Sequence, residues 1–164
     1  MESNSRFPHE LIKGKIAELI FELMFRETGK FTALRFGYEY TLPELAQYRN
    51  IVEVQNVLNN ISNSPDFVLI KNEKNADGKL EVFTVEVKYQ RDINREKIKE
   101  IAESTLKTWD PSWLFVATPE CFYFTACRRI VENNGEMWKL TDNWVSEPLK
   151  KKYLELLRDF EINH

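Results

Sequence analysis

The hydrophobic residues of this chain recur at helical spacing in three separate stretches. The first covers residues 10–28, where apolar positions occupy a wide face and Gly29 follows in the position that often ends a helix. The second covers residues 94–108, and the third covers residues 148–160. These periods predict three amphipathic helices, of which the first is packed on two sides.

Short runs rich in β-branched and aromatic residues lie between these stretches and are typical of strands. The turn sequence Asn75-Ala76-Asp77-Gly78 separates residues 67–70 from residues 82–89, so we expect a hairpin there. The continuous apolar run 113–117 is typical of a strand that is buried on both faces. The remaining predicted strands are residues 31–40, residues 122–126, and a short return strand at residues 137–140.

The order of these elements predicts an α/β protein with a mixed β-sheet. The hairpin is antiparallel, whereas the strand–helix–strand crossover between Glu86 and Val116 implies a parallel pair. Helices are then expected on both faces of the sheet. Residues 42–61 have two interpretations, because their apolar positions recur at helical spacing, yet Ile51-Val52-Glu53-Val54 also suits an extended chain.

The composition is that of one well-packed domain spanning residues 1–164, with 43% hydrophobic and 13% aromatic residues. No cationic segment precedes an apolar run near residue 1, and no apolar stretch approaches the about 20 residues of a membrane helix. We therefore expect a soluble, cytoplasmic protein without membrane contact. In that compartment Cys121 and Cys127, which fall in a predicted strand region, are expected to be reduced thiols.

Candidate chemistry is concentrated on the predicted hairpin. Asp66 opens its first strand, and Glu86 and Lys88 lie in its second strand, where alternation places both side chains on the same face. Two carboxylates and an amine brought together in this way suit a magnesium-dependent phosphodiesterase. The competing interpretation is that Asp66 only ends a loop and that Glu86 and Lys88 lie on a solvated strand face.

With these elements in place, the chain resembles the PD-(D/E)XK nuclease superfamily, which has the restriction-endonuclease-like fold. The motif stands here as Pro65-Asp66 followed by Glu86-Val87-Lys88. The segment Lys13-Gly14-Lys15-Ile16-Ala17-Glu18 is similar to the Gly-x-x-x-Glu opening of members that resemble Holliday-junction resolvases. The resemblance implies an αβββαβ core, which residues 11–119 can supply, and leaves residues 120–164 as a C-terminal extension.

The resemblance also implies an activity, that of a metal-dependent endonuclease that cleaves DNA with Mg²⁺ or Mn²⁺. Lys88 would orient the attacking water and stabilise negative charge, and desolvation near the metal would lower its pKa until it could act as a base. Gln90 would hydrogen-bond a ligand or the scissile phosphate. The implied metal ligands are Asp66, Glu86, the main-chain carbonyl of Val87, and Glu18.

The role of Glu18 as a metal ligand has two rivals. Glu22 lies one turn after Glu18 and could take its place in the site. Lys15 and Glu18 at i,i+3, and Glu22 and Arg26 at i,i+4, would also form ordinary helical ion pairs without any catalytic role.

Nucleic acid, with DNA as the expected substrate, is the partner that the resemblance implies, and a homodimer would suit cleavage of both strands of a duplex. The net charge of −3 counts against a dedicated nucleic-acid binder. It favours an alternative, an inactive module of the same fold that binds protein or nucleic acid. A further alternative is an unrelated α/β scaffold in which Asp66, Glu86 and Lys88 do not meet.

The basic side chains that flank the predicted site are candidate contacts for the phosphates of a nucleic acid. They are Lys13, Lys15, Lys71, Lys74, Arg91, Arg95 and Lys97, with Arg128-Arg129 as another local pair.

Overall fold

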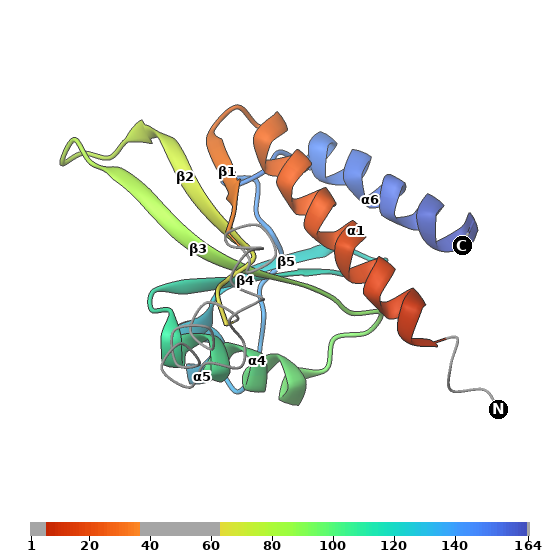
Figure 1. Cartoon of the computed structure of the whole chain (residues 1–164). Helices are drawn as coiled ribbons and strands as arrows, with labels where there is room; N and C mark the ends of the chain where they lie inside the picture. Colours follow the sequence, from red (N-terminus) through yellow and green to blue (C-terminus); the bar gives the residue numbers. More distant parts are fainter. Residues whose placement is uncertain (1–5, 37–62, 164) are drawn as a thin grey trace, which may run out of the picture.

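The computed structural model describes residues 6–36 and 63–163 of the chain (Figure 1). The predicted continuation of the first strand to residue 40 and the undecided segment 42–61 lie outside the described residues. Within the two described ranges, none of the helices combines the length and the apolar character that crossing a bilayer requires. The elements are α1 (Arg6–Glu27), β1 (Phe31–Arg35), β2 (Phe67–Lys74), β3 (Leu80–Tyr89), α4 (Arg95–Thr108), β4 (Ser112–Ala117), β5 (Phe122–Ala126), α5 (Cys127–Glu132) and α6 (Glu147–Asn163).

The strands form one five-stranded sheet in the order β1-β2-β3-β4-β5. The pairs β1–β2, β2–β3 and β4–β5 are antiparallel, and β3–β4 is parallel, with Glu86 opposite Leu114 and Lys88 opposite Val116. The parallel pair is connected through α4, as a crossover between parallel strands requires. The prediction of an α/β protein with a mixed sheet is confirmed.

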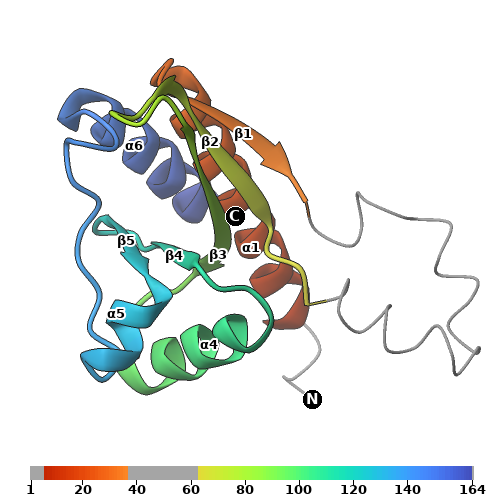
Figure 2. The same cartoon turned by 90° about the vertical axis from the view of Figure 1, so that its left-hand side faces the viewer.

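Helices cover the two faces of the sheet in separate pairs. Helices α1 and α6 lie side by side on one face, and α4 and α5 lie on the other (Figures 1 and 2). The larger core lies under α1, where the buried ring of Phe21 is 5.0 Å from that of Phe67 and 5.1 Å from that of Phe115, measured between ring centres. Residues beyond 119 belong to this core, because Tyr153 and Leu157 of α6 are buried in it.

Two local sequence signals explain the elements that carry the candidate site. The side-chain oxygen of Asn75 accepts hydrogen bonds from the main-chain nitrogens of Asp77 and Lys79, and Gly78 has a φ of 73°, so this turn closes the β2–β3 hairpin. Asn94 caps α4, because its side-chain oxygen accepts from the nitrogen of Lys97 at 3.0 Å. The hairpin and the second helix therefore follow the predicted bounds closely.

Other boundaries differ from the predictions. Helix α1 begins four residues earlier than residue 10, because Pro8 is tolerated in a first helical turn although the apolar period starts after it. Cys127 opens the short helix α5 and does not continue a strand, since six residues are too few to show a helical period. The predicted return strand 137–140 is reduced to one isolated bridge, between Lys139 and Tyr123 of β5.

Candidate functional site

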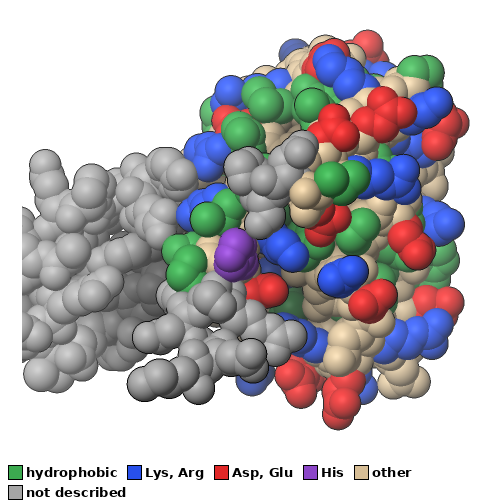
Figure 3. All heavy atoms as spheres, turned by 90° about the vertical axis from the view of Figure 1, so that its right-hand side faces the viewer, with side chains coloured by type: hydrophobic (Ala, Val, Ile, Leu, Met, Phe, Trp, Pro, Cys, Tyr) green, Lys and Arg blue, Asp and Glu red, His purple; other side chains and the backbone are tan. Residues whose placement is uncertain are grey.

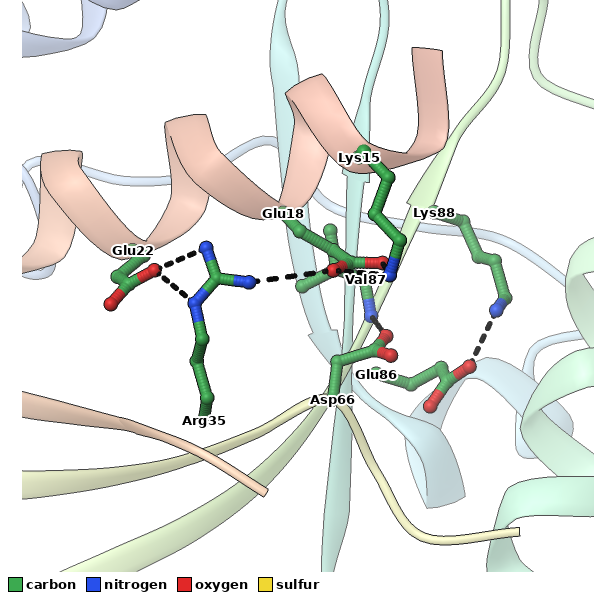
Figure 4. Close-up of polar contacts among 8 residues, drawn as sticks. All are labelled: Lys15, Glu18, Glu22, Arg35, Asp66, Glu86, Val87 and Lys88. Atoms are coloured by element: carbon green, nitrogen blue, oxygen red, sulfur yellow. Dashed lines mark hydrogen bonds and ion pairs between the residues drawn. The ribbon is translucent and has the colours of Figure 1, made fainter. Parts of the chain in front are cut away.

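Asp66 lies immediately before β2 and reaches the neighbouring strand with its side chain. Its Oδ2 atom accepts a hydrogen bond of 2.7 Å from the main-chain nitrogen of Val87 in β3 (Figure 4). This contact places the carboxylate beside the segment between Glu86 and Lys88. The convergence of Asp66 with the second strand of the hairpin, which the motif predicts, is present in the structure.

Glu86 and Lys88 project from β3 on the face opposite α1. Val85 and Val87 alternate with them and are buried in the core under α1, so the period of two is obeyed. The Nζ atom of Lys88 donates to Oε1 of Glu86 at 2.5 Å, and 18% of the Glu86 side chain is exposed. Because 40% of the Lys88 side chain is exposed, the competing interpretation of a solvated strand face fits Lys88 better than Glu86.

A hollow of about 350 Å³ separates this face of β3 from α4. Glu86 and Lys88 line it from the sheet, and Glu100, Ser104 and Thr105 line it from the helix. Ser64 contributes from the segment that leads into β2. The two charged side chains of the motif thus face a concave, accessible space between the sheet and a helix, as ligand-binding groups commonly do.

Helix α1 brings Glu18 to the same place. Its side chain is 15% exposed and approaches Lys15 Nζ at 3.3 Å and a terminal nitrogen of Arg35 at 3.8 Å (Figure 4). The field of the Asp66 carboxylate acts on it directly. Glu18, Asp66 and the pair on β3 therefore come together from α1, β2 and β3.

Glu22 is buried one turn further along α1 and belongs to a different group of contacts. Its carboxylate binds Arg35 at 2.5 Å and Arg26 at 2.9 Å. Arg26 also donates to the carbonyl oxygen of Ala33 in β1 at 2.9 Å. Both of the expected helical ion pairs are present, and Glu22 ties α1 to β1, whereas Glu18 is the helix acid that faces Asp66.

Burial and repulsion from neighbouring carboxylates raise the pKa values of Glu86 and Glu18. For Glu86 the largest cause is burial, which Lys88 opposes and the nearby charges of Asp66 and Glu18 reinforce. For Glu18 burial and then Asp66 raise the pKa, while Lys15 and Arg35 lower it. The cations Lys88, Lys15 and Arg35 therefore offset only part of the effect of burial and of the neighbouring carboxylates.

The pKa of Lys88 moves in the direction opposite to the one expected for a base. Burial acts to lower this pKa, but the adjacent carboxylate of Glu86 raises it, and Asp66 and Glu18 add to that effect, so that it lies above its ordinary value. Lys88 is an ammonium group at neutral pH in this arrangement. The predicted lowering concerns a Lys88 that is desolvated beside a bound metal, and for that state it stays a prediction.

Gln90 follows β3 and is used within the fold. Its main-chain nitrogen donates to the carbonyl oxygen of Ala117, at 3.0 Å. Its side-chain oxygen accepts from the main-chain nitrogen of Asn94 at 3.1 Å and so fixes the entry into α4. The predicted contact of Gln90 with a ligand or phosphate is not the contact that its oxygen makes in the structure.

The donor chemistry of the site fits a hard divalent cation, because carboxylate oxygens are the ligands that Mg²⁺ and Mn²⁺ prefer. Asp66, Glu86 and Glu18 offer such oxygens, and their mutual repulsion is what a cation would relieve. In the arrangement seen here, however, no group of three His, Cys, Asp or Glu side chains within residues 6–36 and 63–163 is placed to hold a metal ion. Glu86 is turned towards Lys88 and Glu18 towards Lys15, so binding would require these pairs to open.

Several of the candidate phosphate contacts already have partners within the protein. Lys71 pairs with Glu81, and Arg128 pairs with Asp110. The ammonium group of Lys13 lies over the ring of Tyr89, at 5.3 Å from its centre. Positive and negative side chains are interspersed on the face that carries the start of α1 and the end of α6 (Figure 3). These contacts weaken the prediction of a broad phosphate-binding surface around the site.

Arg35 is the site residue that the sequence patterns do not reveal. It lies at the end of β1 and contacts Glu22 and Glu18, which are 13 and 17 positions earlier in the chain. Helical or strand periodicity relates only near neighbours, so no pattern could link these residues. A lone cation at the end of an apolar strand is the only hint, and it does not identify a partner.

No model of a known protein family matches this chain, and no curated protein matches it either. The class of the protein is therefore defined by its own geometry. It is an α/β protein with a mixed five-stranded sheet, and its candidate site lies where α1, β2, β3 and α4 meet.

Proposed function

We propose that this chain is a metal-dependent nuclease of the restriction-endonuclease-like fold that hydrolyses phosphodiester bonds in DNA. The observation that carries the proposal is the meeting of Asp66, Glu86, Lys88 and Glu18, from three separate elements, beside a hollow. The order α1, β1, β2, β3, α4, β4 supports it, because this is the αβββαβ order that the resemblance implies.

Each side chain has a distinct role in this proposal. Asp66, Glu86 and Glu18 would hold the cation, with the main-chain carbonyl of Val87 as a further oxygen donor. A bound Mg²⁺ or Mn²⁺ supplies a nucleophilic water and neutralises charge on the phosphate. Lys88 would leave Glu86 and pair with the phosphate. As an ammonium group it would then stabilise the negative charge that develops on the phosphate.

The hollow between β3 and α4 gives the phosphate a place beside these groups. Lys88 and Glu86 line it, and the hydroxyl-bearing side chains of Ser104 and Thr105 face them from α4. The hydroxyl of Ser104 can donate a hydrogen bond to a phosphate oxygen without adding charge, whereas that of Thr105 donates to the carbonyl oxygen of Ile101 at 2.8 Å. The phosphate would therefore be bound from the sheet by Lys88, and the carboxylate of Glu100 on the helix wall would have to turn away from it or be neutralised by the cation.

An inactive module of the same fold is the second candidate, and one observation favours it. Lys88 is bonded to Glu86, and the described residues contain no assembled set of three metal ligands. If this ion pair persists in solution, the carboxylate stays engaged and no cation binds. The protein would then use its surface to bind a partner without cleaving it.

Cleavage assays on single-stranded, duplex and branched DNA and on RNA, with Mg²⁺ or Mn²⁺, test the proposal. We expect turnover of DNA by the wild type and none by Asp66→Asn or Glu86→Gln. Lys88→Gln should also abolish turnover. Glu81→Gln is the matched control, because Glu81 lies on the same strand but pairs with Lys71 at the far end of the hairpin, and it should retain full activity.

The melting temperature with and without Mn²⁺ separates the two candidates. Binding to the folded state alone raises the melting temperature, and we expect this rise in the wild type and its loss in Asp66→Asn. Absence of both cleavage and the Mn²⁺ effect in the wild type would overturn the nuclease proposal and favour the inactive module. Equal cleavage by the wild type, Asp66→Asn and Glu86→Gln would mean that a contaminant is responsible.

A further inference from the structure

A second hollow, of about 250 Å³, lies where β5 meets the chain that connects α5 to α6. This connection runs alongside β5 (Figure 2), and Lys139 within it forms a bridge with Tyr123. None of the residues that line this second hollow takes part in the proposed nuclease mechanism. Its walls are aromatic, formed by Trp113 of β4, Phe124 of β5, and Trp138 and Trp144 of the connection.

Three of these rings hold one another in place. The ring centre of Trp113 is 4.9 Å from that of Phe124 and 5.1 Å from that of Trp144. Phe124 and Trp144 meet edge to face, with centres 4.9 Å apart. Such packing fixes the wall in advance of any binding, so a ligand would lose little free energy in ordering it.

Trp138 forms the more exposed wall, since 39% of it is accessible to solvent. Its main chain is nevertheless fixed to β5, because its nitrogen donates to Oγ1 of Thr125 at 2.9 Å and its carbonyl oxygen accepts from the nitrogen of Phe124 at 3.0 Å. The indole is therefore presented to solvent from a rigid backbone. An exposed aromatic surface held in this way is suited to stacking against a flat ring.

The hollow carries positive charge and no negative charge. Arg129 and Lys139 line it, and no Asp or Glu does. The guanidinium of Arg129 lies 5.0 Å from the ring centre of Trp138. Within residues 6–36 and 63–163 no carboxylate pairs with Arg129 or Lys139, whereas Arg128 pairs with Asp110. Aromatic walls with cations beside them match a flat aromatic ligand that bears negative charge.

We propose that this hollow binds a nucleotide, with the base against the aromatic wall and the phosphate at Arg129 and Lys139. Bases stack on exposed aromatic side chains irrespective of their sequence, and guanidinium groups pair well with phosphate. The same chemistry serves a free nucleotide and a nucleotide within a single strand. The proposal is independent of the nuclease proposal, because it involves neither Asp66 nor Glu86.

Calorimetric titration of the full chain with thymidine 5′-monophosphate, and separately with a short oligothymidylate, tests this proposal. EDTA is present throughout, so cleavage does not contribute and the result does not depend on the nuclease activity. Trp138→Ala should weaken binding at least about tenfold, which corresponds to about 1.4 kcal/mol, and Trp138→Phe should restore most of the affinity. Arg129→Gln should also weaken it. The matched control is Arg128→Gln, which should stay within about twofold of the wild type, because the salt bridge of Arg128 lies with Asp110.

Two results of the titrations would support the proposal. Binding of both probes would assign the hollow to nucleotides in general. Binding of the oligothymidylate alone would assign it to nucleotides within a strand. Binding of neither probe by the wild type overturns it. Equal weakening by Arg128→Gln and Arg129→Gln also overturns it, because diffuse surface charge would then explain the affinity. If Trp138→Ala does not fold, as circular dichroism would show, the comparison of the two arginine variants decides.

Discussion

Replacing Arg35 with glutamine tests whether the contacts between α1 and β1 stabilise the fold around the site. Arg35 donates to the Glu22 carboxylate through Nε at 2.6 Å, and a terminal nitrogen lies 2.5 Å from the same oxygen. Its guanidinium also lies over the ring of Phe67, at 5.5 Å from the ring centre. Glu22 is buried, with 8% of its side chain exposed, so loss of Arg35 leaves a carboxylate that water cannot fully solvate.

The structure sets the expected magnitude. Removing one partner of a fully buried ion pair costs about 3–5 kcal/mol of stability. This cost is reduced here, because Arg26 remains 2.9 Å from Glu22 and 24% of the Arg35 side chain is exposed. We therefore expect Arg35→Gln to lower the free energy of unfolding by about 2 kcal/mol. The matched variant Arg26→Gln removes a side chain that is 51% exposed, and it should cost about 0–1 kcal/mol.

Urea denaturation at neutral pH measures both variants against the wild type. For a slope of about 2 kcal/mol per molar urea, Arg35→Gln should lower the midpoint by roughly 1 M while leaving the slope unchanged. Arg26→Gln should lower it by less than half as much. If Arg26→Gln is as destabilising as Arg35→Gln, the claim that the buried Glu22 carboxylate depends mainly on Arg35 is refuted.

Two further predictions concern the backbone and the pH dependence of stability. Gly135→Ala should lower the melting temperature well beyond Gly78→Ala, because both glycines have a positive φ but only at Gly135 would the new methyl group lie 2.0 Å from the carbonyl oxygen of Arg95; equal shifts would refute this. The pKa of Glu27 is lowered chiefly by the hydrogen bond from Lys152. The unfolded chain therefore binds this proton first, and the stabilisation is present above the ordinary pKa and lost as the pH falls through the lowered value. The melting temperature of the wild type should exceed that of Glu27→Gln at pH 7, and the difference should shrink as the pH falls below the ordinary pKa of a glutamate. A difference that does not change with pH would contradict the assignment.

Local patterns were sufficient for much of the fold. The alternation along residues 82–89 predicted that Glu86 and Lys88 share a face, and the turn at Asn75–Gly78 predicted the hairpin. The crossover through the helix at residues 94–108 predicted the parallel pair. These predictions succeeded because strand alternation, turn chemistry and crossover topology depend on residues that are near one another in the chain.

Contacts within the site were predicted less completely. The meeting of Asp66 with the strand of Glu86 followed from the hairpin, but the short bond between Lys88 and Glu86 and the resulting rise in the Lys88 pKa did not. Gln90 was predicted to contact a ligand or phosphate, yet its side-chain oxygen accepts a hydrogen bond at the start of α4. Spacing assigns a side chain to a face but does not determine which of several neighbours it binds.

The amino-acid sequence by itself determined the α/β class, the mixed sheet and the face on which the charged motif lies, because hydrophobic periodicity decides which surfaces are buried. Only the tertiary structure decided that Glu18 faces Asp66 while Glu22 binds Arg35, and that Trp113, Phe124, Trp138 and Trp144 line one hollow. These groups come from elements far apart in the chain. Their distances depend on how helices and strands pack against one another, and no local pattern encodes that packing.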